Sequence, residues 1–145
     1  MLSPYRVLDV TDERGHFAGM LLAGLGAEVI KIEPPHGVHS RRLPPFAPDG
    51  TSLTHAAYDR GKRSVALDLE THADRERFLG LVDGADVVLD SLGAGSLENL
   101  GLGFDTLLAR NPSLVVGTVT AFGHGGPKAN WPATDLTVMA SGCTM

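Results

Sequence analysis

The chain has 145 residues, of which 43% are hydrophobic and 20% are charged, a composition typical of a globular domain with a sizeable core. Its 17 acidic and 12 basic residues give a net charge of −5, which argues against a general nucleic-acid binder because such proteins are usually basic. The lone cysteine, Cys143, excludes an intrachain disulfide and favours a reducing compartment, and we expect it to be a small buried residue. The sequence shows no secretory leader and no apolar run near the ~20 residues that span a membrane, so we expect a cytoplasmic protein without a membrane partner.

The first third of the chain predicts a β-α-β unit. The run RVLDVT at 6–11 favours a strand, and AEVIKIE at 27–33 favours a second strand that ends at Pro34 and Pro35. The bulky residues of segment 15–26 are spaced to share one face of a helix: Phe17, Met20, Leu21 and Leu25. The length of the unit suits a crossover between two parallel strands.

Segment 34–59 differs from its surroundings. It carries five of the nine prolines and shows no clear periodicity, so we expect a long irregular loop.

Strand and helix patterns then alternate. We expect strands at 64–69, 85–90 and 113–122, a helix at 71–84 with Thr71 as its N-cap and Phe78, Leu81 and Val82 facing inward, and short helical pieces at 97–100 and 105–110. The alternation predicts an α/β fold with a mostly parallel sheet and helices on both faces.

The last stretch reads as the start of another helix. Thr134 is a suitable N-cap, and Asp135 stands in the first turn. Two interpretations of Asp135 are open: its carboxylate stabilises the start of the helix, or it supports an active site.

The densest group of cations is RGKRS, in which Arg60, Lys62 and Arg63 lie within four residues. Arginine binds phosphate through paired hydrogen bonds and lysine as a point charge, so this cluster is a candidate phosphate site that Arg41 and Arg42 could join. The alternative interpretation is a solvated turn before an edge strand.

Other signals are weaker. The sequence lacks G-x-G-x-x-G after its first strand, so Glu33 alone does not indicate a dinucleotide site. The Gly-rich segment 123–127 could cradle an anion or form a plain turn. The six histidines form no metal-binding spacing, and we expect no metal.

Taken in order, four stretches resemble the N-terminal part of the class III coenzyme A transferases of the CaiB/BaiF type. They are LGAEVIKIEPP, RGKRSVALDLETHADRERFLGLVDGADVVLDS, LENLGLGFDTLLARNPSLVVGTVTAFGHGGP and ATDLTVMASG, and they cover nearly the whole chain.

The resemblance implies that 1–145 is the incomplete N-terminal part of a Rossmann-like domain, with CoA bound across the carboxyl edge of its sheet. Members of the family move CoA between carboxylic acids or epimerise acyl-CoA, and they form interlocked homodimers. The resemblance assigns the nucleotide of CoA to Arg60, Lys62 and Arg63, with Arg41 and Arg42 as further candidates.

Several positions depart from the family pattern. Gly15-His16-Phe17 replaces an Ala-Gly-Pro-like turn, Asp59 replaces an asparagine, and Ser91 and Ala94 replace an amide and a proline. Thr134 stands where the racemase branch has a histidine, which disfavours racemase chemistry.

By the family's order, the catalytic aspartate, which forms an anhydride and then a thioester, falls beyond Met145 and is not Asp135. We therefore expect the 145-residue chain to be inactive alone and to represent a CoA transferase. The alternatives are a non-catalytic or degenerate CoA-binding subunit and, second, an acyl-CoA racemase.

Overall fold

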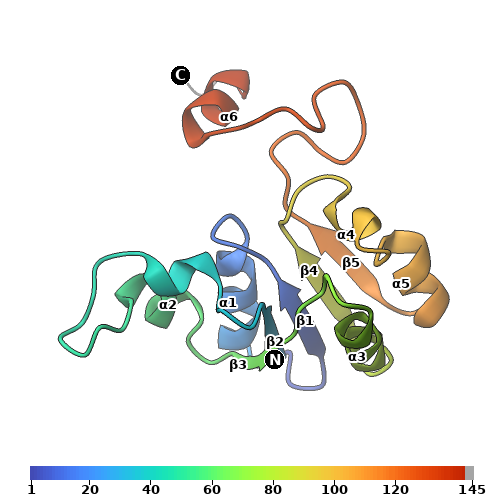
Figure 1. Cartoon of the computed structure of the whole chain (residues 1–145), viewed down its shortest axis with the longest axis horizontal. Coiled ribbons are helices and arrows are strands. Elements are labelled where there is room, and N and C mark those ends of the chain that lie inside the picture. Colours follow the sequence, from blue (N-terminus) through green and yellow to red (C-terminus); the bar gives the residue numbers. More distant parts are fainter. Residues whose placement is uncertain (143–145) are drawn as a thin grey trace.

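The computed structural model describes residues 1–142, so Cys143 lies outside the described part of the chain. Within residues 1–142, five parallel strands form one sheet in the order β3-β2-β1-β4-β5 (Figure 1). The strands are β1 (Arg6–Val10), β2 (Glu28–Glu33), β3 (Arg63–Ala66), β4 (Val87–Asp90) and β5 (Val115–Thr118). The predicted α/β class is confirmed, and each strand lies inside its predicted range except β3, which begins one residue earlier.

One face of the sheet carries the main apolar core. It is covered by α3 (His72–Val82), α4 (Ser96–Asn99) and α5 (Phe104–Arg110) (Figure 1). Phe78 and Val82 of α3 and Leu107 of α5 are fully buried against Leu8 and Val88 of the central strands. The predicted inward face of α3 is confirmed, with Leu81 partly buried beside this core.

The opposite face is covered by α1 (His16–Gly24) in an unexpected orientation. The helix turns Gly19 toward the sheet, where a Cβ would lie 2.2 Å from Asp9 Oδ2. Phe17 and Leu21 of the helix and its C-cap Leu25 are exposed. The close approach of Gly19 to the buried Asp9 carboxylate therefore determines which face of α1 packs against the sheet. The apolar face predicted from the spacing points toward solvent instead.

Segment 34–59 is more ordered than its prolines indicated. It contains the 3₁₀ turn η1 (His39–Arg42) and the helix α2 (Leu53–Tyr58), whose N-cap Ser52 accepts a hydrogen bond from the His55 amide. The prediction of one continuous irregular loop is wrong here, because a six-residue helix is too short to show a periodic pattern.

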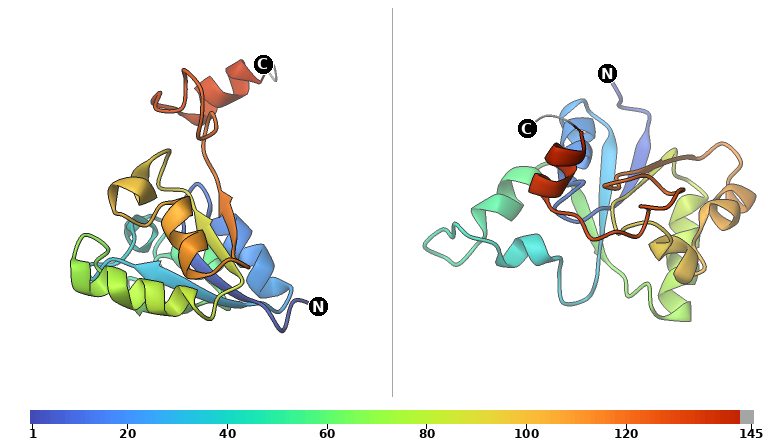
Figure 2. Two further views of the ribbon diagram at one scale, coloured as in Figure 1. Left: turned by 90° about the vertical axis from the view of Figure 1, so that its right-hand side faces the viewer. Right: turned by 90° about the horizontal axis from the view of Figure 1, so that it is seen from above.

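The helix α6 (Asp135–Ser141) stands apart from the sheet, beyond the carboxyl ends of the strands (Figures 1 and 2). Thr134 is its N-cap and forms a reciprocal capping box with Thr137, as the sequence indicated for the helix start. Asp135 is exposed in the first turn, a position that suits stabilisation of the helix start. None of the helices in residues 1–142 is long and apolar enough to cross a membrane.

Candidate functional site

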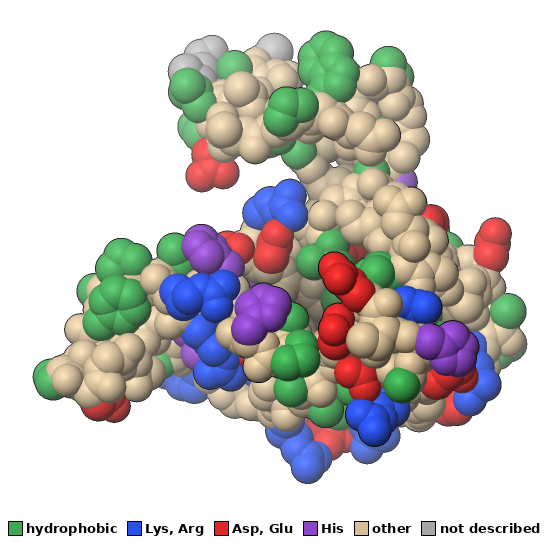
Figure 3. Space-filling model, viewed as in Figure 1, with side chains coloured by type: hydrophobic (Ala, Val, Ile, Leu, Met, Phe, Trp, Pro, Cys, Tyr) green, Lys and Arg blue, Asp and Glu red, His purple; other side chains and the backbone are tan. Residues whose placement is uncertain are grey.

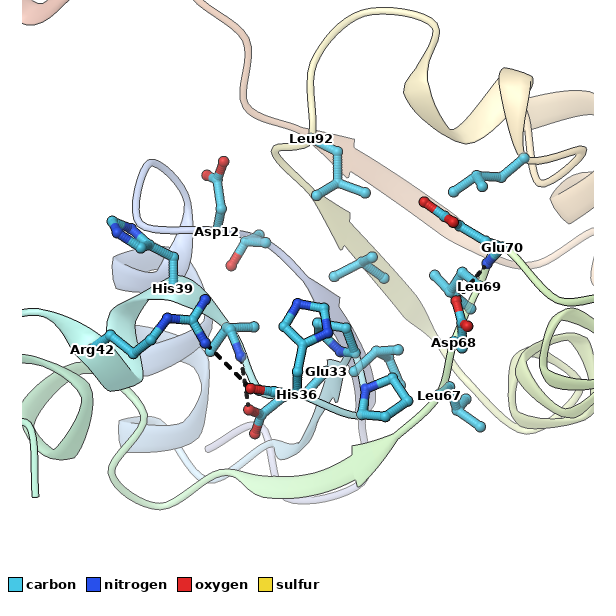
Figure 4. Close-up of a pocket in the computed structure, with 18 residues that line it drawn as sticks. Asp12, Glu33, His36, His39, Arg42, Leu67, Asp68, Leu69, Glu70 and Leu92 are labelled. Carbon is cyan, nitrogen blue, oxygen red and sulfur yellow. Dashed lines mark hydrogen bonds between the residues drawn. The ribbon is translucent and has the colours of Figure 1, made fainter.

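A cavity of about 680 Å³ opens over the carboxyl ends of β1, β2, β3 and β4 (Figure 4). Its walls come mainly from segments 10–12, 32–39 and 67–70, with Arg42, Leu92 and Leu100. Ligands of open parallel sheets bind at this edge, next to the point where the strand order reverses, which here is between β1 and β4. The fold therefore places this cavity where a ligand is expected.

One side of the cavity is formed by the turn after β2 and carries His36, His39 and Arg42. Arg42 donates from Nη1 to the carbonyl of His36 at 3.3 Å, which holds its guanidinium beside the cavity. Figure 3 shows blue and purple side chains gathered on this side of a hollow in the surface. This side is suited to an anion.

The turn is anchored from below by Glu33 at the end of β2. Its carboxylate accepts hydrogen bonds from Arg41 at 2.6 and 2.7 Å and from the Ser64 hydroxyl at 2.6 Å. These bonds, with those of Arg41 contributing most, lower the pKa of Glu33 from 4.5 to about 2. Glu33 is thus an ionised internal anchor for Arg41, and its oxygens are not free to bind a ribose, in line with the absence of a dinucleotide motif from the sequence.

The turn between β1 and α1 lines the cavity through Asp12. Ser91, which follows β4, donates to Asp12 Oδ1 at 2.6 Å and accepts from the Asp12 amide at 2.8 Å. Glu13 lies 2.7 Å from His39 Nδ1 and links this turn to η1. Ser91, one of the departures from the family pattern, therefore joins two loops at the rim.

The other side of the cavity follows β3 and is acidic. Leu67 and Leu69 present apolar surface, and Asp68 and Glu70 add carboxylates, across the cavity from His39 and Arg42 (Figure 4). The sequence analysis missed this segment as a site. The signal was available, because LDLE stands at the end of the predicted strand 64–69 and so had to lie at the carboxyl edge of a parallel sheet.

Lys62, a predicted phosphate ligand, lies in the interior. Its side chain is 1% exposed, and Nζ contacts Asp9 Oδ2 at 2.8 Å, Asp59 Oδ1 at 2.7 Å and the His16 carbonyl at 3.1 Å. The negative charge of Asp59, which the sequence placed beside the phosphate site, instead neutralises Lys62. The Lys62 ammonium has no donor directed at the cavity.

The same interior network includes Lys31 of β2, 3.2 Å from Asp9 Oδ1. Burial alone would raise the pKa of Asp9, but the ammonium groups of Lys31 and Lys62 outweigh it and hold that pKa below its usual range. His16 stacks on Tyr58 with 4.2 Å between ring centroids, and burial lowers its pKa. The network ties α1 and the end of α2 to the sheet.

The other predicted ligands do not meet at one place. Arg63 binds Glu28 at 2.6 Å at the start of β2, toward the amino edge of the sheet. Arg60 is exposed and does not line the cavity, and Arg41 is paired with Glu33. Of the five predicted residues, Arg42 alone lines the cavity, and nucleotide binding by the other four is not supported by their positions.

A second cavity of about 700 Å³ lies between the β4–α4 turn and the segment that leads into α6. Arg14, Trp131 and Asp135 are among its lining residues.

The Gly-rich segment 123–127 lines neither cavity, and its role as an anion cradle stays a prediction. Among residues 1–142, no group of three or more His, Cys, Asp or Glu side chains is placed to hold a metal ion.

The comparison with known proteins decides the family. The family model described as CoA-transferase family III matches residues 2–145. The chain belongs to CoA-transferase family III. The predicted resemblance is confirmed.

Relatives of this CoA-transferase chain are longer than it is. It is 44% identical to a probable fatty acyl-CoA transferase of Mycobacterium tuberculosis, over 96% of this chain and 36% of that protein. It is 40% identical to a succinyl-CoA:mesaconate CoA-transferase of Haloarcula hispanica, over 99% of this chain and 39% of that protein. The structure superposes on a CAIB/BAIF family protein from Brucella suis with a TM-score of 0.90 at 35% identity, covering 97% of this chain and 39% of that one. The chain thus spans little more than a third of these relatives.

Proposed function

We propose that this chain is the CoA-binding part of an enzyme that transfers CoA between carboxylic acids, and that the nucleotide of CoA occupies the cavity over β1 to β4. The observation that carries the proposal is the cavity's place at the carboxyl edge of a family III fold, with Arg42, His36 and His39 on one wall. Acyl-CoA and a carboxylic acid are the substrates of the proposed reaction.

The proposal moves the site away from RGKRS. A phosphate oxygen needs a donor that is not already satisfied, and Lys62 is committed to two buried carboxylates. Arg42 is bound only to a carbonyl oxygen in the described contacts and keeps further N–H groups for a diphosphate. Homodimer formation and the absence of catalysis by the 145-residue chain remain predictions from the family.

A matched pair of arginine variants tests the site. Arg42→Ala should weaken CoA binding about five- to tenfold, because a charge-assisted contact to the diphosphate is lost. Arg60→Ala removes the same charge from an exposed position outside the cavity and should change the affinity less than about twofold. Isothermal titration with CoA gives both affinities, and a thermal-shift titration gives an independent check.

The opposite order of the two affinity losses would place the nucleotide site elsewhere. If Arg60→Ala weakens binding and Arg42→Ala does not, the nucleotide lies at RGKRS as the resemblance first implied. If CoA at millimolar concentration neither binds nor raises the melting temperature, this chain does not carry the CoA site.

A further inference from the structure

The charges of the cavity are divided between its two sides. His36, His39 and Arg42 line the side formed by the turn after β2, whereas Asp68 and Glu70 line the side that follows β3 (Figure 4). Among the described lining residues, Arg42 is the one arginine or lysine. The other two lining carboxylates do not alter this division, because Arg41 and Ser64 occupy Glu33, and Arg14 and Ser91 occupy Asp12.

Hydrogen bonds fix the backbone turn that carries the acidic side. Asp68 Oδ1 accepts from the Glu70 amide at 3.1 Å, and the Asp68 amide donates to Asp74 Oδ2 at 2.9 Å. The Thr71 amide donates to the carbonyl of Asp68 at 2.9 Å, which closes the turn before α3. These bonds hold the Asp68 carboxylate and the backbone of the turn from which the Glu70 side chain extends.

Nearby cations do not neutralise this side. Arg75 directs Nη1 to the carbonyls of Leu69 and Glu70, at 3.2 and 2.8 Å, and lines a different hollow. Arg77 pairs with Asp74 at 2.9 Å. Neither guanidinium group forms an ion pair with Asp68 or Glu70 among the described contacts, and Glu70 remains an exposed negative charge at the cavity.

The separation of basic and acidic residues determines how CoA is oriented in the cavity. This orientation rests on the proposed function. The diphosphate is attracted to Arg42 and the histidines. The adenosine then lies against the β3 side, where Leu67 and Leu69 can contact the adenine ring and the carboxylates can accept hydrogen bonds from amino or hydroxyl groups. The 3′-phosphate of CoA is attached to that ribose, so it enters the acidic half of the cavity.

We propose that this site does not recognise the 3′-phosphate of CoA, and that Glu70 sets this specificity. A dianionic phosphate beside Asp68 and Glu70 finds like charges instead of a cation, which lowers affinity. The ligand class is therefore an adenosine 5′-diphosphate that carries pantetheine, with or without the 3′-phosphate. The site binds 3′-dephospho-CoA at least as tightly as CoA.

The test compares CoA with 3′-dephospho-CoA by isothermal titration on the 145-residue chain and on three variants. The unmodified chain should bind dephospho-CoA as tightly as CoA or more tightly. Glu70→Gln should shift the preference toward CoA, and Glu70→Lys should shift it by about fivefold or more because a repulsive charge becomes an attractive one. Glu76→Lys makes the same charge change at an exposed α3 residue outside the cavity and should leave the preference within about twofold.

The possible failures are distinct. If CoA binds more than threefold tighter than dephospho-CoA, or if Glu70→Lys does not change the preference, this inference is wrong while the proposed function stands. If neither compound binds, the proposed function is wrong and this inference falls with it. Glu70 is exposed, so its variants should fold, which unchanged melting temperatures of the free variants verify.

Discussion

Lys62 and Arg42 belong to two regions that the sequence analysis joined into one phosphate site. Lys62 is enclosed by Asp9 and Asp59, with 1% of its side chain exposed, and it connects α1, α2 and the sheet. Arg42 stands at the surface of η1 and faces a cavity. A cluster of cations thus indicates a binding site only where the cations lack internal carboxylate partners.

The largest expected effect is on the interior region. Lys62→Ala should lower the free energy of unfolding by about 3–5 kcal/mol, because it leaves Asp9 and Asp59 buried without their shared ammonium group. Urea unfolding followed by circular dichroism measures the change. Asp59→Asn in the Lys62→Ala background should recover part of the loss, since it removes the carboxylate that is left without a lysine, whereas Asp9 keeps Lys31. A loss below about 1 kcal/mol for Lys62→Ala would contradict the structural role.

An intermediate effect is expected at Glu33, which anchors Arg41 beside the cavity. The pKa of Glu33 is lowered to about 2, so its contribution to stability is complete above its ordinary pKa of 4.5 and is lost as the pH falls toward 2. We expect this contribution to be about 2 kcal/mol after allowing for the water that screens the half-exposed Arg41.

Glu33→Gln tests that anchor. The difference in unfolding free energy between the unmodified chain and the variant should be largest near neutral pH and should shrink as the pH is lowered from 4.5 to 2. Urea unfolding at a series of pH values gives this difference. A difference that does not vary over that range would show that the Glu33 carboxylate is not ionised by its contact with Arg41.

The smallest expected effect is at the rim. Arg42→Ala should change the free energy of unfolding by less than about 0.5 kcal/mol, because the residue is exposed and its one described contact is with a carbonyl at 3.3 Å. The same urea experiment applies, with Arg60→Ala as the control. A loss comparable to that of Lys62→Ala would mean that Arg42 is also structural, and the contrast between the two regions would disappear.

The order of the elements and the parallel sheet could be predicted from the sequence because strand runs and helical spacing are local. The partner of Lys62 could not, since Asp9 lies 53 residues away and comes near only once β1 and the turn before β3 are in place. The packing of α1 was missed for a related reason: Gly19 packs against the sheet because of a buried carboxylate that its own helix does not contain.

The candidate site was predictable only in part. Arg42 was proposed on its charge, and its place beside the cavity follows from η1, a turn that the proline-rich sequence did not reveal. Asp68 and Glu70 stand at the end of a predicted strand, so their position at the carboxyl edge could have been inferred. The division of the cavity into a basic and an acidic side depends on how Arg41, Arg75 and Arg77 are paired, which requires the structure.

The most direct test of the central claim is a titration of the ¹⁵N-labelled 145-residue chain with CoA, followed by the NMR shifts of its backbone amides. We predict the largest shifts in segments 36–42 and 67–70, which lie on opposite sides of the cavity. Shifts confined to segment 60–64, or no shifts with CoA at millimolar concentration, would contradict the account.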